Sequence, residues 1–235
     1  MALTGALLLE LALYASSFVC GIVTAVYLAV VQGEFGGRCM LYGLVTYNAQ
    51  ADVIGVQSSS AASLCHFVTA ISVIVAVVCF SLTLYLVYNL CIERVVTRER
   101  LGMNVIVAAS GIFLFFLLIT GCMLKIGRDS LCSSIMQHVH NITSCEQAQD
   151  KTWVSPLTGK WFYSRLHKAE TAVWVNFFFW LIIGVIMIIQ RRQNTGSKFT
   201  EGASGGLFGG GPAATSEETA PIFGGPSSVP SQPWE

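Results

Sequence analysis

The stretch FVTAISVIVAVVCFSLTLYLVYNL, residues 67–90, contains no Asp, Glu, Lys or Arg. Because about 20 apolar residues of α-helix cross a hydrocarbon core roughly 30 Å thick, this run is long enough to span a membrane. Three further charge-free runs occupy residues 11–31, 102–124 and 171–190. The sequence therefore predicts four transmembrane helices.

Composition supports a membrane domain. The 235 residues are 54% hydrophobic and 11% charged, whereas a soluble domain is roughly 25% charged. Helices satisfy their own backbone in lipid, and the ten-residue alternation of a membrane barrel is absent. The first run has no basic region before it and continues to Val31, so we interpret it as a retained span and not as a signal peptide. We expect an all-α membrane protein with a four-helix bundle over residues 1–190.

The orientation follows from the loops. Four spans place both termini on one side and the long loops, 32–66 and 125–170, on the other. Basic residues divide six to seven between the sides, but they are densest at 94–100 and 191–192, as in cytoplasmic flanks. The loops hold four cysteines, and cysteine pairs persist in oxidising compartments. We therefore expect cytosolic termini and extracytoplasmic loops. The loop cysteines are Cys39, Cys65, Cys132 and Cys145.

Four cysteines allow three pairings. Closure within each loop favours Cys39 with Cys65 and Cys132 with Cys145, while a bridge between the loops and four free thiols stay open as alternatives. His138 and His140 lie near the second pair and suggest zinc. Their spacing matches no closed zinc site, and oxidised cysteines do not bind metal, so we predict no metal and no cofactor.

Two positions are candidates for modification. Asn141 begins the sequon Asn-Ile-Thr in the second loop, on the side where N-glycosylation takes place. Chance occurrence of an unused sequon is the alternative. Cys91 lies at the cytosolic end of the second span, near Arg94, a position where palmitoylation is possible.

The first span carries a small residue at every fourth position: Ser17, Gly21, Ala25 and Ala29. Small residues let helices approach closely in lipid. We interpret this stripe as packing inside the bundle, with a homo-oligomer seam as the alternative. Asn176, inside the last span, is expected to form an interhelical hydrogen bond.

The loops and the tail also carry local signals. CMLYGLVTY, residues 39–47, predicts a strand or hairpin beneath the first disulfide. Trp161, Phe162, Tyr163 and Leu166 resemble an aromatic belt at the lipid surface, and Glu170 suits the positive end of the last helix. After Glu201 the chain is rich in Gly, Pro and Ser, so residues 191–235 are expected to be a disordered cytosolic tail.

Several loop motifs resemble the transmembrane protein 179 family. They are GRCMLYG (37–43), SLCHFV (63–68), SLCSSI (130–135), SCEQAQ (144–149) and FYSRLHKAETAVWVN (162–176). The resemblance covers roughly residues 1–190 and includes all four loop cysteines. It implies a four-span protein of plasma or secretory-vesicle membranes, and it brings no catalytic residues.

Function is constrained mainly by what the spans lack. Intramembrane catalysis needs carboxylates, a nucleophile with a base, or metal ligands, and the charge-free runs hold neither carboxylates nor histidines. We therefore expect a non-enzymatic protein that organises other membrane proteins in the bilayer, without nucleic acid. A small channel, a transporter or its accessory subunit is the alternative, with a polar seam around Asn176, Thr24 and Thr120.

Overall fold

The computed structural model describes residues 2–91, 100–139 and 142–204. Four long helices dominate these ranges: α1 (Ala2–Glu34), α2 (Ala62–Cys91), α3 (Arg100–His138) and α4 (Phe162–Ser204). Each contains a stretch long and apolar enough to cross a membrane. Residues 1–194 form one compact unit, and the chain from Thr195 belongs to another. The predicted four-span architecture is confirmed.

The helices are longer than the charge-free runs. The candidate span of α2 has 30 residues, or about 45 Å of helix, which exceeds a hydrocarbon core of about 30 Å. At one end α3 continues 14 residues beyond Leu124, and α4 begins at Phe162 instead of 171. A charge-free criterion finds only the lipid-embedded part, because charged turns outside the lipid do not interrupt a helix. The loop expected at 125–170 is therefore helical at both ends.

The start of the C-terminal tail also differs from the prediction, because the last helix is longer than its charge-free run. It was predicted from residue 191, but α4 continues to Ser204. The first proline after the last span is Pro212, so up to Ser204 only isolated glycines oppose the helix, and each costs about 1 kcal/mol. Residues 205–235 lie outside the described ranges.

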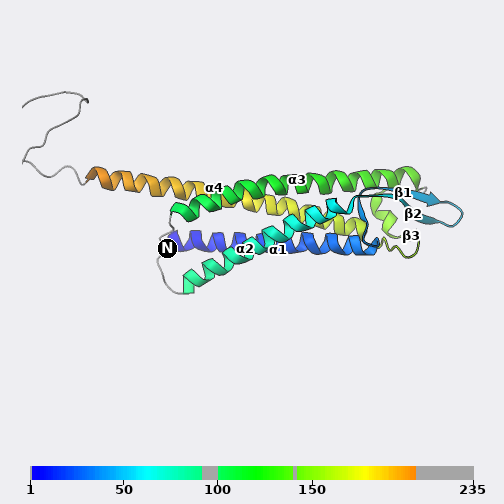
Figure 1. Ribbon diagram of the computed structural model, residues 1–235, viewed down its shortest axis with the longest axis horizontal. Coiled ribbons are helices and arrows are strands. Elements are labelled where there is room, and N and C mark those ends of the chain that lie inside the picture. Colours follow the sequence, from blue (N-terminus) through cyan, green and yellow to red (C-terminus); the bar gives the residue numbers. More distant parts are fainter. Residues whose placement is uncertain (1, 92–99, 140–141, 205–235) are drawn as a thin grey trace, which may run out of the picture. The chain divides into compact units, whose positions relative to one another are not determined.

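A small sheet lies at the end of the bundle where α1 and α3 finish and α2 and α4 begin (Figure 1). We call this the sheet end. Strands β1 (Cys39–Asn48) and β2 (Val53–Ser60) form an antiparallel hairpin, and β3 (Thr152–Trp153) adds to β2 in parallel. The hairpin predicted in the first loop is confirmed. A short 3₁₀ helix, η1 (Cys145–Gln149), precedes β3.

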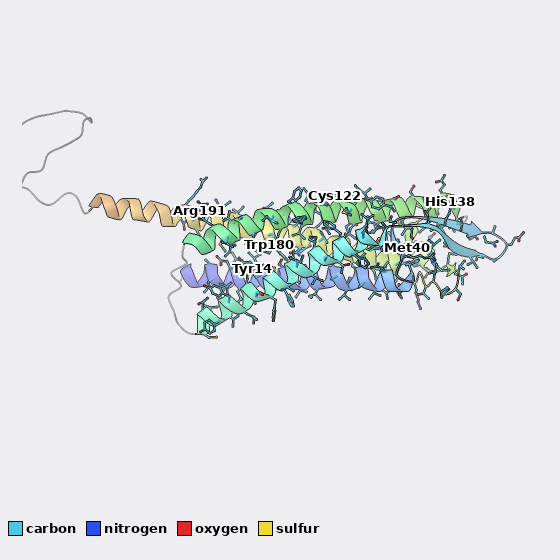
Figure 2. All side chains as sticks on the ribbon, in the orientation of Figure 1. Tyr14, Met40, Cys122, His138, Trp180 and Arg191 are labelled. Atoms are coloured by element: carbon cyan, nitrogen blue, oxygen red, sulfur yellow. A yellow bond between two sulfur atoms is a disulfide. The ribbon has the colours of Figure 1, made fainter. Side chains whose placement is uncertain are left out.

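The core of the bundle is built by contacts around α1 and α4. Tyr14 and Trp180, labelled in Figure 2, meet edge to face with ring centroids 6.2 Å apart. The ring centroid of Phe113 of α3 lies 4.7 Å from that of Trp180. Phe67 of α2 faces Phe116 of α3 at 6.3 Å, so α2 and α3 also touch.

The outer faces of the helices carry large apolar side chains without protein cover. A soluble protein rarely exposes so much contiguous apolar surface, whereas lipid solvates it. Members of this set from each helix, with exposed fractions of 50% or more, include Val19, Val26, Ile74, Val77, Ile112, Phe115, Phe178 and Ile189.

Candidate interaction site

Two disulfides anchor the sheet end. Cys39, the first residue of β1, is bonded to Cys65 in the first turn of α2, and Cys132 of α3 is bonded to Cys145 of η1. The Cα atoms are 5.7 Å and 5.3 Å apart, within the ordinary range. These are the two pairings that closure within each loop favours. Each bond ties a loop segment to the end of a membrane helix.

An aromatic cluster forms the core beneath β3. Phe35, Trp153 and Phe162 meet edge to face, with ring centroids 5.1 to 6.3 Å apart. The indole N–H of Trp153 donates to the carbonyl of Ala148 at 3.2 Å. Gly159 lies directly against the indole ring, where a Cβ would overlap Trp153. The last loop is therefore packed around one tryptophan.

This cluster corrects the predicted aromatic belt. Phe162 and Leu166 are buried in protein, and only Trp161 is more than half exposed. Their apolar faces were read as lipid contacts, but Phe162 packs against Phe35 and Trp153 from distant parts of the chain. The side chains therefore stabilise the sheet end from inside.

The helix extension of α3 supports β1. The backbone N–H of Val45 donates to the hydroxyl of Ser134 at 3.0 Å, and both groups are buried. Two turns before Ser134 on α3, a Cβ on Gly127 would lie 3.0 Å from Leu41 and 3.1 Å from Tyr42. The strand therefore rests directly on the helix at a glycine, and its outer edge is covered by α3.

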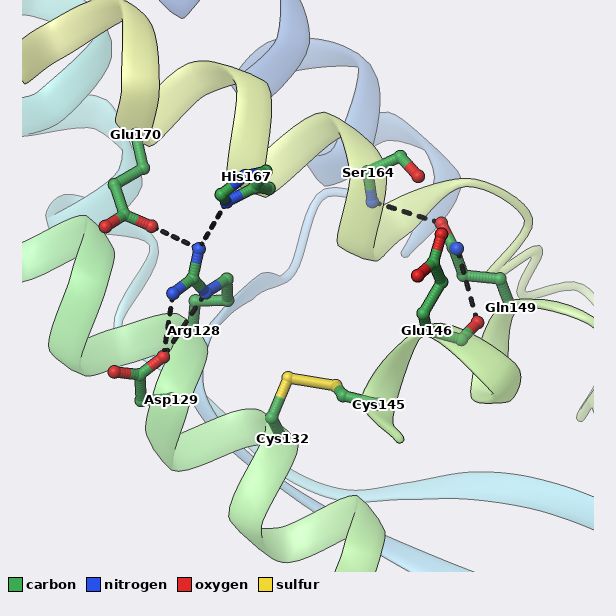
Figure 3. Close-up of a disulfide and its surroundings, with 9 residues drawn as sticks. All are labelled: Arg128, Asp129, Cys132, Cys145, Glu146, Gln149, Ser164, His167 and Glu170. Carbon is green, nitrogen blue, oxygen red and sulfur yellow. Dashed lines mark hydrogen bonds and ion pairs between the residues drawn. A yellow bond between two sulfur atoms is a disulfide. The ribbon is translucent and has the colours of Figure 1, made fainter. Parts of the chain in front are cut away.

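A charged cluster joins α3 to α4 beside the second disulfide (Figure 3). Arg128 forms an ion pair with Glu170 and another with Asp129 at 2.9 Å, and it contacts His167 Nδ1 at 2.8 Å. Its guanidinium also lies 5.8 Å from the ring centre of Tyr163. Glu170 was expected at the positive end of the last helix, but α4 begins two turns earlier. Its carboxylate is instead neutralised by Arg128.

The ion pair of Arg165 with Glu34 joins α4 to the end of α1. At the hairpin tip, the Tyr47 hydroxyl donates to Asp52 at 2.6 Å, and Lys151 lies 3.2 Å from the same carboxylate. These contacts, the Tyr47 hydrogen bond first and Lys151 second, lower the pKa of Asp52, and the same hydrogen bond raises the pKa of Tyr47. Exposed charges thus link the hairpin to the strand that follows η1.

The surface of this end carries both apolar side chains and a groove. Four large apolar side chains, which we call the rim residues, are exposed on β1, α3 and the segments around β3: Leu44 (45%), Met136 (52%), Val154 (48%) and Trp161 (53%). A groove of about 520 Å³ runs beside β2 and is lined by Phe35, Gly36, Arg38, Gly55, Val56 and residues 154–157. The sheet end therefore offers surface suited to a protein partner.

The predicted packing stripe of α1 lies mostly inside the bundle. Ser17, Gly21 and Ala25 are buried, whereas Ala29 is exposed. A Cβ on Gly21 would lie 2.8 Å from the carbonyl oxygen of Ser72, so α1 and α2 are in close contact there. Successive i+4 positions advance about 40° around a helix, which turns Ala29 away from the face of Ser17.

Asn176 accepts a hydrogen bond from the Ser17 hydroxyl, and both side chains are buried. Cys79 of α2 lies 3.3 Å from the same hydroxyl. The polar atoms of three helices thus meet at one point of the bundle. This is the kind of interhelical hydrogen bond expected for Asn176.

The two candidate modification sites differ in placement. Cys91 is the last residue of α2 and is exposed. Asn141 lies outside the described residues. The Nδ1 atom of His138 is 2.9 Å from the carbonyl of Ser134, and within the described ranges no three His, Cys, Asp or Glu side chains gather as a metal site would require.

Sequence reasoning missed two polar pairs between distant segments. One is Arg128 with Glu170, and the other is Glu10, which is buried on α1 and contacts the amide of Gln190 at 2.7 Å. A signal existed for Glu10, because an acid among leucines in LLLELAL needs a partner in the membrane. Nothing local identified Gln190 as that partner.

Together these features define a multi-pass membrane protein whose four helices carry a small, disulfide-bonded sheet at one end. The chain belongs to the Transmembrane protein 179/179B Claudin domain family, which it matches over residues 6–207. The family resemblance drawn from the loop motifs is thereby confirmed.

Individual relatives agree with the family match. The chain is 54% identical over 226 residues to "Transmembrane protein 179B" of Danio rerio, which covers 96% of this chain and 99% of that protein. It is 40% identical over 193 residues to the protein of the same name from Homo sapiens, covering 82% of this chain and 86% of the relative. It is 38% identical over 184 residues to the protein of the same name from Mus musculus, covering 78% of this chain and 82% of the relative. No solved structure matches the chain.

Proposed function

We propose that this chain is a non-enzymatic interaction protein of the plasma membrane or secretory-vesicle membranes, which presents its sheet end to partner membrane proteins outside the cytoplasm. The observation that carries the proposal is the combination of two disulfides with exposed rim residues on the same small sheet end. Binding is favoured when a partner covers exposed Leu, Met and Trp side chains, because removal of their apolar surface from water lowers the free energy. Fixing them on a rigid scaffold lowers the entropy lost on binding.

The orientation rests on chemistry at the two ends. Both cystines lie at the sheet end, and disulfides persist in oxidising compartments. The sequon that begins at Asn141 lies in the same loop as the second cystine. Epitope tags on either terminus should be accessible to antibodies only after permeabilisation of cells. Tags that are accessible on intact cells would overturn this orientation.

The polar groups of the bundle support a structural role for the spans. The Ser17 hydroxyl donates to Asn176 and lies 3.3 Å from the Cys79 sulfur, and Thr24 donates to the carbonyl of Cys20 at 3.0 Å. Groups engaged in this way are held by helix packing and are not arranged around a reacting atom. Specificity is therefore expected from the sheet end.

The test is crosslinking and capture from native membranes with rim variants. The double variant Leu44→Ser, Trp161→Ser removes two exposed apolar side chains and leaves the aromatic core intact. We expect the proteins captured reproducibly with the wild type to be lost, while expression and both cystines are retained. Glu146→Gln, a change of an exposed side chain on η1, is the matched control. An unchanged set of captured proteins in the double variant would overturn the proposal.

A channel or accessory transport subunit is the second candidate. The observation that favours it is Thr120, whose buried hydroxyl has no hydrogen-bond partner among the residues that the structure describes, together with the buried carboxylate of Glu10. Reconstituted protein that conducts ions, with the flux abolished by Asn176→Leu, would support this function. The same measurement without flux would favour the interaction role.

A further inference from the structure

Within the described residues, no strand pairs with the outer edge of β2 beyond its first two residues. β3 pairs only with Val53 and Ile54, and after Trp153 the chain turns away, since the N–H of Leu157 donates to the carbonyl of Val154 at 2.9 Å. The groove beside β2 begins where this pairing stops, at Gly55 and Val56.

The backbone of Val56 faces the groove. The carbonyl of Ile54 accepts the N–H of Val154 at 3.0 Å, so Ile54 presents its backbone groups to the β3 side. Alternate residues of a strand face the same edge, and Val56 is therefore directed the same way. Its β1 partner Val45 gives independent support, because the Val45 N–H points away from β2 to Ser134. Within the described part of the chain, the N–H and C=O of Val56 are thus left for a ligand.

The opposite wall of the groove is formed by two loops. Residues 154–157 follow β3, and the segment Phe35–Arg38 adjoins them because Thr158 donates from its N–H to the carbonyl of Glu34 at 3.2 Å. The groove of about 520 Å³ between β2 and this wall is the space that an extended chain added to β2 would enter. A second copy of the sheet would bring its own loops into the same space, so pairing of two β2 edges is disfavoured.

The charge of the groove is positive. Arg38 is exposed, and within the described part of the chain its guanidinium has no acidic partner. Among the described residues no acidic side chain lines the groove, and the exposed Val154 and half-buried Leu157 supply apolar surface. A ligand with a carboxylate near Arg38 and an aliphatic side chain beside Val154 complements this lining.

We propose that this groove binds an extended peptide segment of a partner protein, which adds a strand to β2 at Val56 and places an acidic side chain on Arg38. Strand addition at a free sheet edge is a general mode of peptide recognition, in which backbone hydrogen bonds give affinity and side-chain contacts give specificity. The inference rests on the proposed interaction function and specifies the chemistry of one partner.

The experiment is a display selection of random hexapeptides on the full-length protein in lipid nanodiscs. We expect the enriched peptides to share an Asp or Glu at one position. Val56→Pro removes the N–H that faces the groove without removing a β1 hydrogen bond, and enrichment should fall to background. Val56→Thr keeps the N–H and is the matched control. Enrichment that is equal on Val56→Pro, or absent on the wild type relative to empty nanodiscs, would overturn the proposal.

Arg38 provides a second test that does not depend on the strand. Arg38→Glu should change the selected residue from acidic to Lys or Arg. Arg38→Gln should weaken binding of a synthetic selected peptide by up to about fivefold, the upper end of the range for exposed ion pairs. If Val56→Pro loses its cystines, the Arg38 reversal decides alone. An acidic preference that survives Arg38→Glu would refute the assignment.

The two proposals fail in distinguishable ways. If the selection yields nothing, but capture from native membranes still requires Leu44 and Trp161, the interaction function stands and the groove is not its site. If capture is independent of the rim residues but the selection responds to Val56 and Arg38, the groove binds peptides and the rim does not recruit partners.

Discussion

Arg128 on α3 forms an ion pair with Glu170 on α4, and only 12% and 11% of the two side chains are exposed. The pair joins residues 42 positions apart in the sequence at the point where the helices leave the apolar part of the bundle. Removal of one partner from such a pair leaves a charge that is poorly solvated.

Glu170→Gln should therefore destabilise the protein. We expect a loss of about 2–3 kcal/mol, below the usual 3–5 kcal/mol for a buried pair because Asp129 and His167 still contact Arg128. Thermal unfolding in detergent measures the change. The exposed Glu146→Gln control should stay within about 0.5 kcal/mol of the wild type, and equal stability of the two variants would contradict the role of the pair.

Gly21→Ala should separate α1 from α2. The added Cβ would lie 2.8 Å from the Ser72 carbonyl oxygen and 3.0 Å from the Ala76 Cβ, and overpacking of this kind costs about 1–3 kcal/mol. A Cβ on Gly111 of α3 would meet no atom of the described residues within 4 Å, so Gly111→Ala should gain stability from helix propensity alone. Thermal unfolding of both variants tests the contact, and a Gly21→Ala protein as stable as Gly111→Ala would contradict it.

The second disulfide should contribute about 3 kcal/mol, as expected for a short closed loop. The double variant Cys132→Ser, Cys145→Ser frees η1 from α3 and exposes the region of Trp153. We expect a lower unfolding temperature and faster proteolysis between residues 139 and 161, which mass spectrometry of the fragments would locate. If the double variant resists proteolysis in this segment as well as the wild type does, the aromatic core holds the segment in place without the disulfide.

The hairpin tip should be insensitive to pH between 7 and 5. The folded pKa of Asp52 lies below its ordinary value of 3.8, so its contacts are complete above that value and are lost as the pH falls through the lower folded pKa. Because the pKa of Tyr47 is raised above 10.0, its hydrogen bond is lost only as the pH rises through that higher value. NMR of labelled tyrosine tests both limits. An Asp52→Asn variant should remove the acidic transition, and a Tyr47 signal that moves between pH 7 and 5 in the wild type would refute the assignment.

The membrane part of the fold was predictable because a single physical rule decides it. Charges are costly in lipid, so runs such as 67–90 identify spans without reference to the rest of the chain. The same rule misplaces helix ends, since Lys125 and Arg128 continue α3 beyond the lipid. The two cystine pairings were also favoured by the sequence, because the two cysteines within each loop are separated by a short segment that closes easily.

The sheet end was less predictable because its contacts join distant segments. Two residues of β3 give no periodic pattern, and Trp153 finds its partners 118 residues earlier at Phe35 and nine residues later at Phe162. Arg38 and Val56 gave no signal of a shared groove. Such sites depend on tertiary packing, which local propensity does not encode.

Because α3 continues unbroken past Leu124, a change in the tilt of its membrane-spanning part also moves the part outside the membrane. Its 14 residues from Lys125 to His138 form an arm of about 20 Å, clamped to β1 by Ser134 and to η1 by a covalent bond. A change of about 10° in helix tilt, such as a thicker or thinner bilayer imposes, would swing the tip of this arm by about 3–4 Å. A change in bilayer thickness would thereby displace the strands by more than half of the roughly 4.8 Å that separates neighbouring chains in a sheet.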